Sequence, residues 1–188
     1  FRSALDPGLT VPPELAPFPR PVIGYIGAVS PWLDQDFLAA AARTHPDWSV
    51  VIIGPVDTDT SALTGFPNIH LLGHRDYRQL PSYLKGFDAT VIPFRVNELT
   101  RGVNPVKLYE YLAAGKPVVS SDLPEVRAFG EMVSLARTPG EFVQKLEEEL
   151  AGDSPGKATA RLEVARQHSW EARAGAVEKQ IERRRGRG

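Results

Sequence analysis

The chain has 188 residues, of which 42% are hydrophobic and 24% charged, which suits a protein with one ordinary globular core. Its formal net charge is −1, from 22 basic and 23 acidic residues, so no overall field draws the chain onto nucleic acid or an anionic membrane. Cysteine is absent, which excludes disulfides, thiolate metal sites and a cysteine nucleophile, and we expect a cytoplasmic location.

The first stretch, residues 1–20, is rich in proline and has no clear periodicity. We interpret it as a linker from a preceding domain, followed by one domain over residues 21–182 and a basic tail over residues 183–188. A solvated terminus explains that tail better than a membrane contact does, because the basic run is short. The longest apolar runs have the length of strands, far below the roughly 20 residues that span a bilayer.

Apolar, β-branched runs alternate with helical patterns along the chain. The expected strands are residues 21–29, 48–56, 69–73, 89–94, 117–121 and 132–136. The expected helices are residues 34–45 with Asp34 as N-cap, 80–87, 105–115, a short one near Glu125, 141–150, and a charged stretch from Ala158 to Ile181. Such alternation implies right-handed crossovers, so we predict an α/β fold with a Rossmann-like, doubly wound parallel sheet flanked by helices.

The helix that follows Asn104 has the clearest boundaries. Asn104 can cap it, Pro105 suits its first position and Gly115 suits its end. A helix start beside the carboxyl ends of parallel strands carries free amide groups and a positive dipole end, and ligands of open α/β sheets bind there. We therefore expect a diphosphate at the residues from Asn104 through Pro105 and Val106 to Lys107.

Glu110 lies at the border of the apolar arc of this helix, and its side chain leans back toward the helix start. A carboxylate placed there can accept hydrogen bonds from both hydroxyl groups of a ribose whose phosphates lie at the first turn. The alternative is a surface pair between Glu110 and Lys107, worth about 0.2–0.5 kcal/mol, and the position of Glu110 alone favours this alternative.

The segment NPVKLYEYLAAGKPVV, residues 104–119, closely resembles the donor-site segment of group 1 glycosyltransferases, those of family 4 and its relatives. In that pattern a Glu is followed, after a few helical residues, by small residues, Gly, Pro and two valines. The chain also resembles successive parts of that family's domain at residues 25–34, 45–55, 68–88 and 169–174. The resemblance implies the nucleotide-sugar-binding C-terminal half of a two-domain, GT-B glycosyltransferase, with Glu110 as the ribose-binding carboxylate.

The chain departs from the family pattern at Gly102. The family commonly places a second Glu there, eight positions before the ribose-binding one, where it contacts the donor sugar. The nearest carboxylate is Glu98, in the predicted loop 95–103, and we take it as the candidate catalytic residue. An exposed loop acid explains Glu98 equally well.

A second departure follows the first strand, where many family members carry an Arg and a Lys aimed at the diphosphate. Residues 27–35 contain no basic residue, so the diphosphate needs the helix dipole, backbone amides and a cation from elsewhere, Arg101 or Lys107. Gly27 permits a ligand to approach the backbone closely, although a tight turn explains it equally well. GYIGAV is not the GxGxxG fingerprint, which disfavours NAD.

The family holds the nucleotide base near the segment GHRDYRQ, residues 73–79. Arg75 or Tyr77 could pack on the base, and we include Arg75 among the donor-binding candidates. For each of these side chains taken alone, an exposed loop residue is the better explanation.

We therefore expect a transferase that moves a sugar from a UDP- or GDP-sugar to an acceptor held by an N-terminal domain, in polysaccharide, cell-envelope or glycolipid synthesis. The histidines show no metal-ligand spacing and no nucleophile elbow is present, so we expect no metal and no cofactor besides the nucleotide sugar. The resemblance favours retention, while Gly102 leaves inversion open. Two alternatives stay open, an epimerase of similar fold and a non-catalytic binding module, as does peripheral membrane association of the full enzyme.

Overall fold

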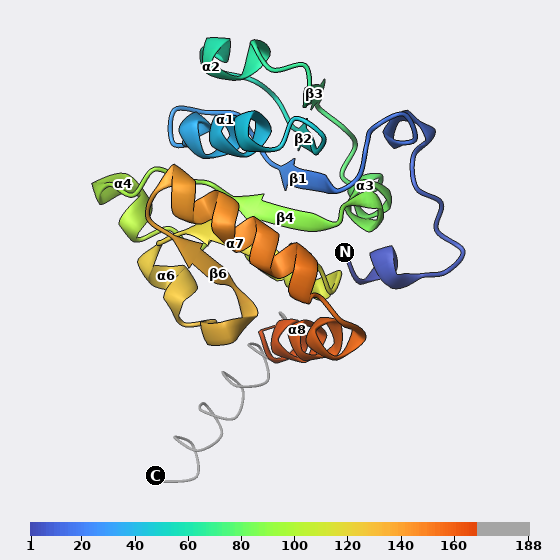
Figure 1. Cartoon of the computed structure of the whole chain (residues 1–188). Helices are drawn as coiled ribbons and strands as arrows, with labels where there is room; N and C mark the ends of the chain where they lie inside the picture. Colours follow the sequence, from blue (N-terminus) through green and yellow to red (C-terminus); the bar gives the residue numbers. More distant parts are fainter. Residues whose placement is uncertain (169–188) are drawn as a thin grey trace, which may run out of the picture.

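The computed structural model describes residues 1–168 and contains a six-stranded parallel sheet. The strand order is β3-β2-β1-β4-β5-β6, and every neighbouring pair runs parallel. The strands are β1 Val22–Ile26, β2 Ser49–Ile53, β3 Ile69–Gly73, β4 Ala89–Ile92, β5 Val118–Ser121 and β6 Ser134–Ala136. The chain runs outward from β1 to β3 and then returns to the other side of β1 for β4 (Figure 1). The predicted doubly wound sheet is therefore confirmed.

The long helices pack on this sheet in two pairs. α1, Gln35–Thr44, packs against α7, Pro139–Gly152, and α5, Val106–Ala113, packs against α8, Pro155–Gln167. Because β1 leads to β2 in one direction and β4 leads to β5 in the other, right-handed crossovers put α1 and α5 on opposite faces. With both faces covered, β1, β2, β4 and β5 are buried at every residue, which explains their content of valine and isoleucine.

Shorter helices occupy the connections. They are α2 Ser61–Thr64, α3 Leu80–Gly86, α4 Glu98–Arg101, α6 Pro124–Arg127, and the 3-10 turns Arg2–Leu5, Pro13–Leu15 and Gly130–Met132. α4 corrects the prediction of a loop at residues 95–103. It forms because the amide of Thr100 donates to Asn97 Oδ1 (3.1 Å) while the amide of Asn97 donates to Thr100 Oγ1 (3.0 Å), a capping box. A single helical turn is too short to show periodicity.

Residues 1–20 pack on the domain. Ala4 and Leu15 are each only 5% exposed. Lys85 Nζ on α3 donates to the carbonyl oxygens of Asp6 (2.6 Å) and Leu9 (2.7 Å). The short 3-10 turns of this segment leave no periodic pattern in the sequence, and its role as a linker to another domain stays a prediction.

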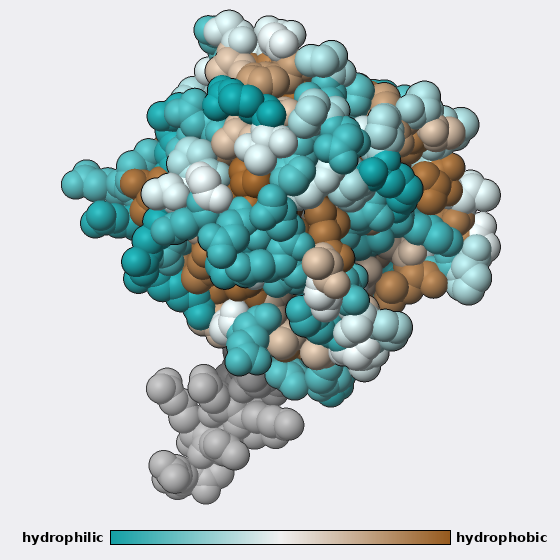
Figure 2. Space-filling view, in the orientation of Figure 1, coloured by the Kyte–Doolittle hydropathy of each residue, from teal (hydrophilic) through white to brown (hydrophobic). Residues whose placement is uncertain are grey.

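The side of the molecule on which α7 lies in front is mostly hydrophilic, with hydrophobic residues in small separate patches (Figure 2). Among residues 1–168, no helix is both long and apolar enough to cross a membrane. The expected continuation of the last helix to Ile181, the family-like stretch 169–174 and the basic tail lie outside the described residues.

The carboxyl ends of β1, β2 and β3 each lead into a glycine, and these glycines lie side by side. Gly27 N donates to Ile53 O (2.8 Å), and Gly54 N donates to Gly73 O (2.9 Å). A Cβ on Gly54 would lie 2.1 Å from Gly27 O, so only glycine fits there. These glycines lie at the carboxyl edge of the sheet, beside the β1/β4 switch point. The connection that follows β4 leads to α5.

Candidate functional site

The start of α5 differs from the prediction by one residue. Pro105 takes the N-cap position in extended backbone, and no side chain accepts a hydrogen bond there. The predicted cap, Asn104, therefore lies outside the helix, and its side-chain amide donates to Tyr109 Oη (2.9 Å) instead. No side chain caps the amides of the first turn. Val106, the first residue of the helix, is 67% exposed. Such a helix start suits an anionic ligand.

Lys107 extends from this first turn across the end of β1. Its Nζ lies 4.7 Å from the ring centre of Phe94 and 5.2 Å from that of Tyr25. A Cβ on Gly27 would lie 2.9 Å from Lys107 Cε and 3.0 Å from Nζ. The predicted close approach at Gly27 is thus made by the side chain of Lys107. Burial lowers the pKa of Lys107 to about 8, and the charge of Glu110 opposes that shift.

Glu110 lies one turn along α5 and is half-buried. Burial raises the pKa of its carboxyl, and the nearby charge of Lys107 opposes this. Its Oε1 is 3.5 Å from the hydroxyl of Tyr77, which comes from the connection between β3 and α3. The charge of Lys107 acts on Glu110 while its ammonium lies over two aromatic rings, so the alternative of a pair between the two side chains stays open. The site thus holds a partly desolvated carboxylate beside a partly desolvated ammonium group.

Two buried tyrosines that were not predicted lie at the end of β1, and one of them, Tyr111, joins α5 to this strand. Tyr111 Oη accepts a hydrogen bond from Ile26 N (2.8 Å), and Tyr25 Oη donates to Ala28 O (3.0 Å). Both side chains are completely buried. Buried tyrosines normally need a partner for the hydroxyl, and this was the only signal in the sequence that either could serve the site.

Glu98 lies in the first turn of α4, beyond the carboxyl end of β4, and is exposed (Figure 1). Gly102 ends the same helix, and a Cβ placed there would meet no atom within 4 Å. The absence of an acid at Gly102 therefore does not follow from crowding. Arg101, the other candidate cation, is also exposed on α4.

Arg75, a predicted contact of the nucleotide base, has its hydrogen-bond partners within the protein. Its Nε and Nη2 donate to the carboxylate of Glu14 (3.2 and 3.0 Å), and its Nε also donates to Tyr83 Oη (2.9 Å). These bonds direct the guanidinium toward α3 and residues 13–15, because a half-buried guanidinium needs acceptors. Tyr77, 67% exposed, is the residue of this connection that contacts Glu110.

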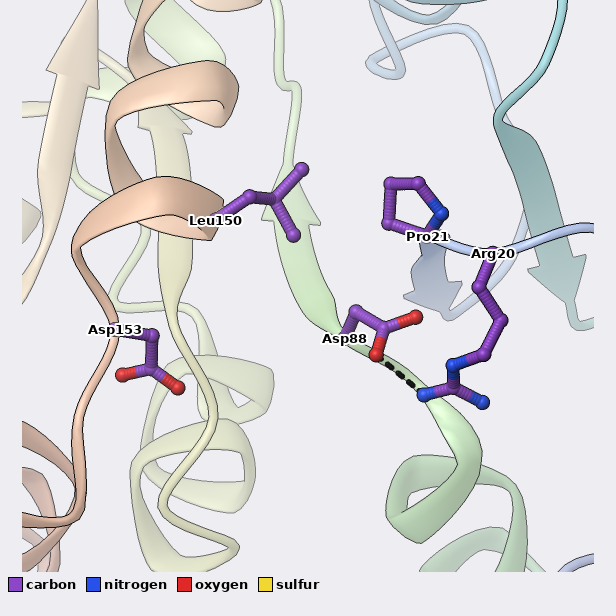
Figure 3. A pocket seen from close by; sticks show the side chains of 5 residues that line it. All are labelled: Arg20, Pro21, Asp88, Leu150 and Asp153. Atoms are coloured by element: carbon purple, nitrogen blue, oxygen red, sulfur yellow. Dashed lines mark hydrogen bonds and ion pairs between the residues drawn. The ribbon is translucent and has the colours of Figure 1, made fainter.

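A cavity of about 430 Å³ lies away from this site, before the amino ends of β1 and β4. Arg20 pairs with Asp88 on one wall, and Leu150 and Asp153 come from the end of α7 on the other (Figure 3). Because its charged pair is satisfied internally, we do not assign the site to it. Within residues 1–168, no group of three or more His, Asp or Glu side chains is arranged to hold a metal ion.

Comparison with known proteins gives a consistent result. The family model for glycosyl transferases group 1 matches residues 20–152. The chain is 31% identical over 159 residues to the putative teichuronic acid biosynthesis glycosyltransferase TuaH of Bacillus subtilis (strain 168), covering 79% of this chain and 40% of that relative. The chain therefore spans less than half the length of this relative.

Solved structures share the fold. Anabaena HepE in complex with UDP matches with a TM-score of 0.67 at 16% identity, over 89% of this chain and 49% of that one. The C-terminal domain of the glycosyl transferase group 1 protein LpcC from Francisella tularensis matches with a TM-score of 0.55 at 17% identity, over 84% of this chain and 90% of that one. At these identities the likeness concerns the fold.

Proposed function

The chain belongs to the group 1 glycosyltransferases, and on that basis we propose that it binds the donor for an enzyme that transfers a sugar from a nucleoside diphosphate sugar to an acceptor. The observation that carries the proposal is the uncapped start of α5, with Lys107 over Gly27 and Glu110 one turn behind. The complex of HepE with UDP supports a nucleotide as ligand.

Each group has a defined task in this proposal. The carboxylate of Glu110 accepts hydrogen bonds from the ribose hydroxyl groups. The diphosphate lies at the residues from Asn104 through Pro105 and Val106 to Lys107. Gly27 leaves room for the side chain of Lys107, which a Cβ at this position would crowd. The ammonium of Lys107 supplies the cation that residues 27–35 lack, with Arg101 as the second candidate.

The chemistry requires that the bond between the anomeric carbon and the diphosphate oxygen breaks while an acceptor oxygen bonds to that carbon and loses its proton. Negative charge grows on the departing diphosphate, and an ammonium with helix-start amides stabilises it. Glu98 would contact the sugar from α4. The family resemblance favours retention of anomeric configuration, and Gly102 leaves inversion open.

The whole enzyme extends beyond these residues in our proposal. The acceptor site belongs to an N-terminal domain, the enzyme acts in the cytoplasm, and the donor is a UDP- or GDP-sugar. The name of the TuaH relative supports a cell-envelope polysaccharide as the product. We propose that neither a metal nor a further cofactor takes part.

Calorimetric titration of the 188-residue chain with UDP and GDP tests donor binding. We expect one of the two to bind and a chelator to leave the affinity unchanged. Binding of neither nucleotide would overturn the proposed function. A loss of affinity with chelator, restored by magnesium or manganese, would overturn its metal-free part.

An assay of donor turnover on the full-length protein separates three functions, two of them enzymatic. Release of free sugar from the nucleotide sugar supports the transferase. Interconversion of the sugar identifies an epimerase, and inertness with intact nucleotide binding identifies a non-catalytic module, which the missing acid at Gly102 would then explain.

A further inference from the structure

The connection between β3 and α3, residues 74–79, is held from outside by residues 1–20. The two oxygens of Glu14 accept hydrogen bonds from Arg75 Nε (3.2 Å) and Nη2 (3.0 Å). Tyr83 on α3 completes the cluster, because its hydroxyl donates to Glu14 and accepts from Arg75 Nε (2.9 Å). An Arg and a carboxylate joined through two N–H groups form a pair with a fixed geometry.

The same guanidinium also fixes the end of its own strand. Arg75 Nη1 donates to Leu72 O (2.5 Å) and to His74 O (3.0 Å). The side chains of Arg75 and Glu14 are 25% and 38% exposed, so solvent screens the pair only in part. The hydrogen bond from Arg75, followed by that from Tyr83, lowers the pKa of Glu14. Arg75 therefore ties residues 1–20 to the end of β3.

Two residues beyond Arg75, the connection reaches the proposed nucleotide site. The hydroxyl of Tyr77 is 3.5 Å from Glu110 Oε1. The ring of Tyr77 meets that of Phe1 edge-on, with ring centres 5.4 Å apart, so residues 1–20 contact the connection a second time. A shift of this segment would thus move both Arg75 and Tyr77.

We propose that Arg75 is a positioning residue, which through Glu14 sets the place of Tyr77 beside a nucleoside diphosphate bound at Glu110. The proposal rests on the proposed function, in which Glu110 binds the ribose. Arg75 does not touch the nucleotide. Its pair with Glu14 couples the packing of residues 1–20 to nucleotide affinity.

The substitution Glu14→Gln tests this coupling in the 188-residue chain. It removes the negative charge of Glu14. Lys85 still donates to the carbonyl oxygens of Asp6 and Leu9, so residues 1–20 stay attached to the domain. We expect affinity for UDP to fall about 3- to 30-fold in calorimetric titration, the range for coupling through a packed network. Thermal unfolding checks that the variant is folded.

A matched control breaks a different ion pair of the same segment. Arg20 pairs with Asp88 at the amino edge of the sheet, and Arg20→Gln should leave UDP affinity unchanged. An equal loss of affinity in both variants would show that any loosening of residues 1–20 suffices, which overturns the specific role of Arg75.

The decisive measurement combines Glu14→Gln with Tyr77→Ala. If Arg75 acts by placing Tyr77, then Glu14→Gln has little further effect once the Tyr77 side chain is gone. Full addition of the two effects, or unchanged affinity in Glu14→Gln, would overturn the proposal while leaving the proposed function standing. A native chain that binds neither UDP nor GDP would overturn the proposed function itself.

Discussion

The two ends of α5 are built in opposite ways. At its carboxyl end, Gly115 takes a left-handed conformation with φ of 69°, and its amide donates to Leu112 O (2.9 Å). The next amide, of Lys116, donates to Tyr111 O (3.1 Å), which completes a Schellman motif. At its amino end, no side chain caps the first turn. One end is satisfied by the protein, and the other is the end at which we propose that a ligand binds.

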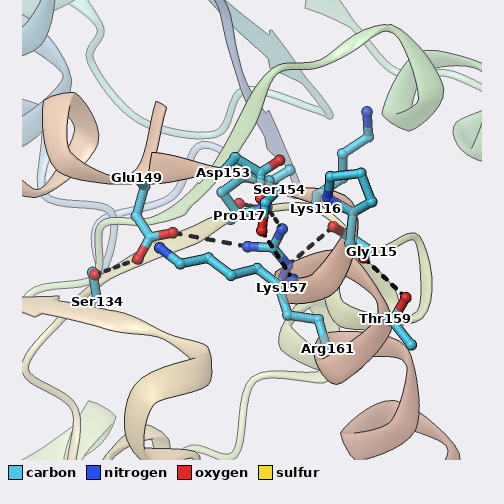
Figure 4. Close-up of polar contacts among 12 residues, drawn as sticks. Gly115, Lys116, Pro117, Ser134, Glu149, Asp153, Ser154, Lys157, Thr159 and Arg161 are labelled. Atoms are coloured by element: carbon cyan, nitrogen blue, oxygen red, sulfur yellow. Dashed lines mark hydrogen bonds and ion pairs between the residues drawn. The ribbon is translucent and has the colours of Figure 1, made fainter. Parts of the chain in front are cut away.

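The charged residues at the two ends of α5 differ in the same way. At the carboxyl end, Arg161 is 2% exposed and its Nε donates to Gly115 O (3.0 Å). It also pairs with Asp153 and lies 3.8 Å from Glu149, so it joins α8 to α7 and α5 (Figure 4). At the amino end, Lys107 and Glu110 are half-buried with shifted pKa values. Arg161, which holds helices together, thus has its partners within the fold, whereas Lys107 and Glu110, which we propose to serve a ligand, are only partly desolvated.

The largest expected effect comes from breaking the carboxyl end. Arg161→Met leaves Asp153 and Glu149 without their cation and Gly115 O without its donor. We expect the free energy of unfolding to fall by about 2–4 kcal/mol, below the full value for a buried pair because Asp153 is 37% exposed. Urea unfolding measures the loss, and the folded variant should bind UDP normally. Arg166→Met, which removes an exposed pair on the same helix, is the control and should show no measurable change.

The second prediction concerns the amino end of α5, where a substitution should lower UDP affinity and leave stability nearly unchanged. Glu110→Ala should weaken UDP binding by about 1.5–3 kcal/mol, the range for hydrogen bonds to a charged group. Unfolding should change little, since the residue is only half-buried. Calorimetric titration measures the affinity, with Glu125→Ala as a control at an exposed acid of α6. Unchanged affinity in a folded variant would remove Glu110 from the site.

The third prediction uses the low pKa of Lys107, about 8. As pH rises through 8, the free protein loses this ammonium while a bound diphosphate favours it, so UDP affinity should decline by at most about tenfold per pH unit. Below pH 8 the affinity should level off. Lys107→Arg stays charged and should lose this decline. A flat profile for the native chain between pH 7 and 9.5 would contradict the role of Lys107.

The stability contribution of Lys107 should change with pH in the opposite direction to UDP affinity. The pKa of Lys107 in the folded chain, about 8, is below its ordinary value of 10.5, so the unfolded chain binds more protons between these values. The contribution of Lys107 to the free energy of unfolding therefore rises as pH increases from 8 toward 10. Urea unfolding of the native chain and of Lys107→Met isolates this contribution by difference.

The smallest expected effect concerns Glu98, which is exposed and removed from the α5 turn that holds Glu110. Glu98→Gln in the full-length enzyme should impair sugar transfer and leave UDP affinity nearly unchanged, because only the intact donor presents sugar hydroxyl groups. Steady-state transfer assays and UDP titration give the two readouts. Normal transfer would assign Glu98 to the exposed surface of α4.

The architecture follows from the pattern of residues along the chain. Strand-length apolar runs can be buried only in a sheet covered on both faces, and the helices between them make the sheet parallel. Local chemistry also located the end of α5, because Gly115 is the residue that tolerates a left-handed conformation. The resemblance of residues 104–119 to the donor-site segment of group 1 glycosyltransferases predicted Glu110 as the ribose-binding carboxylate, whereas its position on the helix alone did not.

The pairing of the site residues depends on contacts between segments that are distant along the chain. Arg75 contacts Glu14, which lies 61 positions away, and the ammonium of Lys107 lies over Tyr25 rather than on the helix surface. The N-cap is Pro105 rather than Asn104, and the side-chain amide of Asn104 donates to Tyr109 Oη. In each case several groups could bond to one polar side chain. Periodicity and residue type identify that side chain, whereas its partner depends on which distant groups the packing brings close to it.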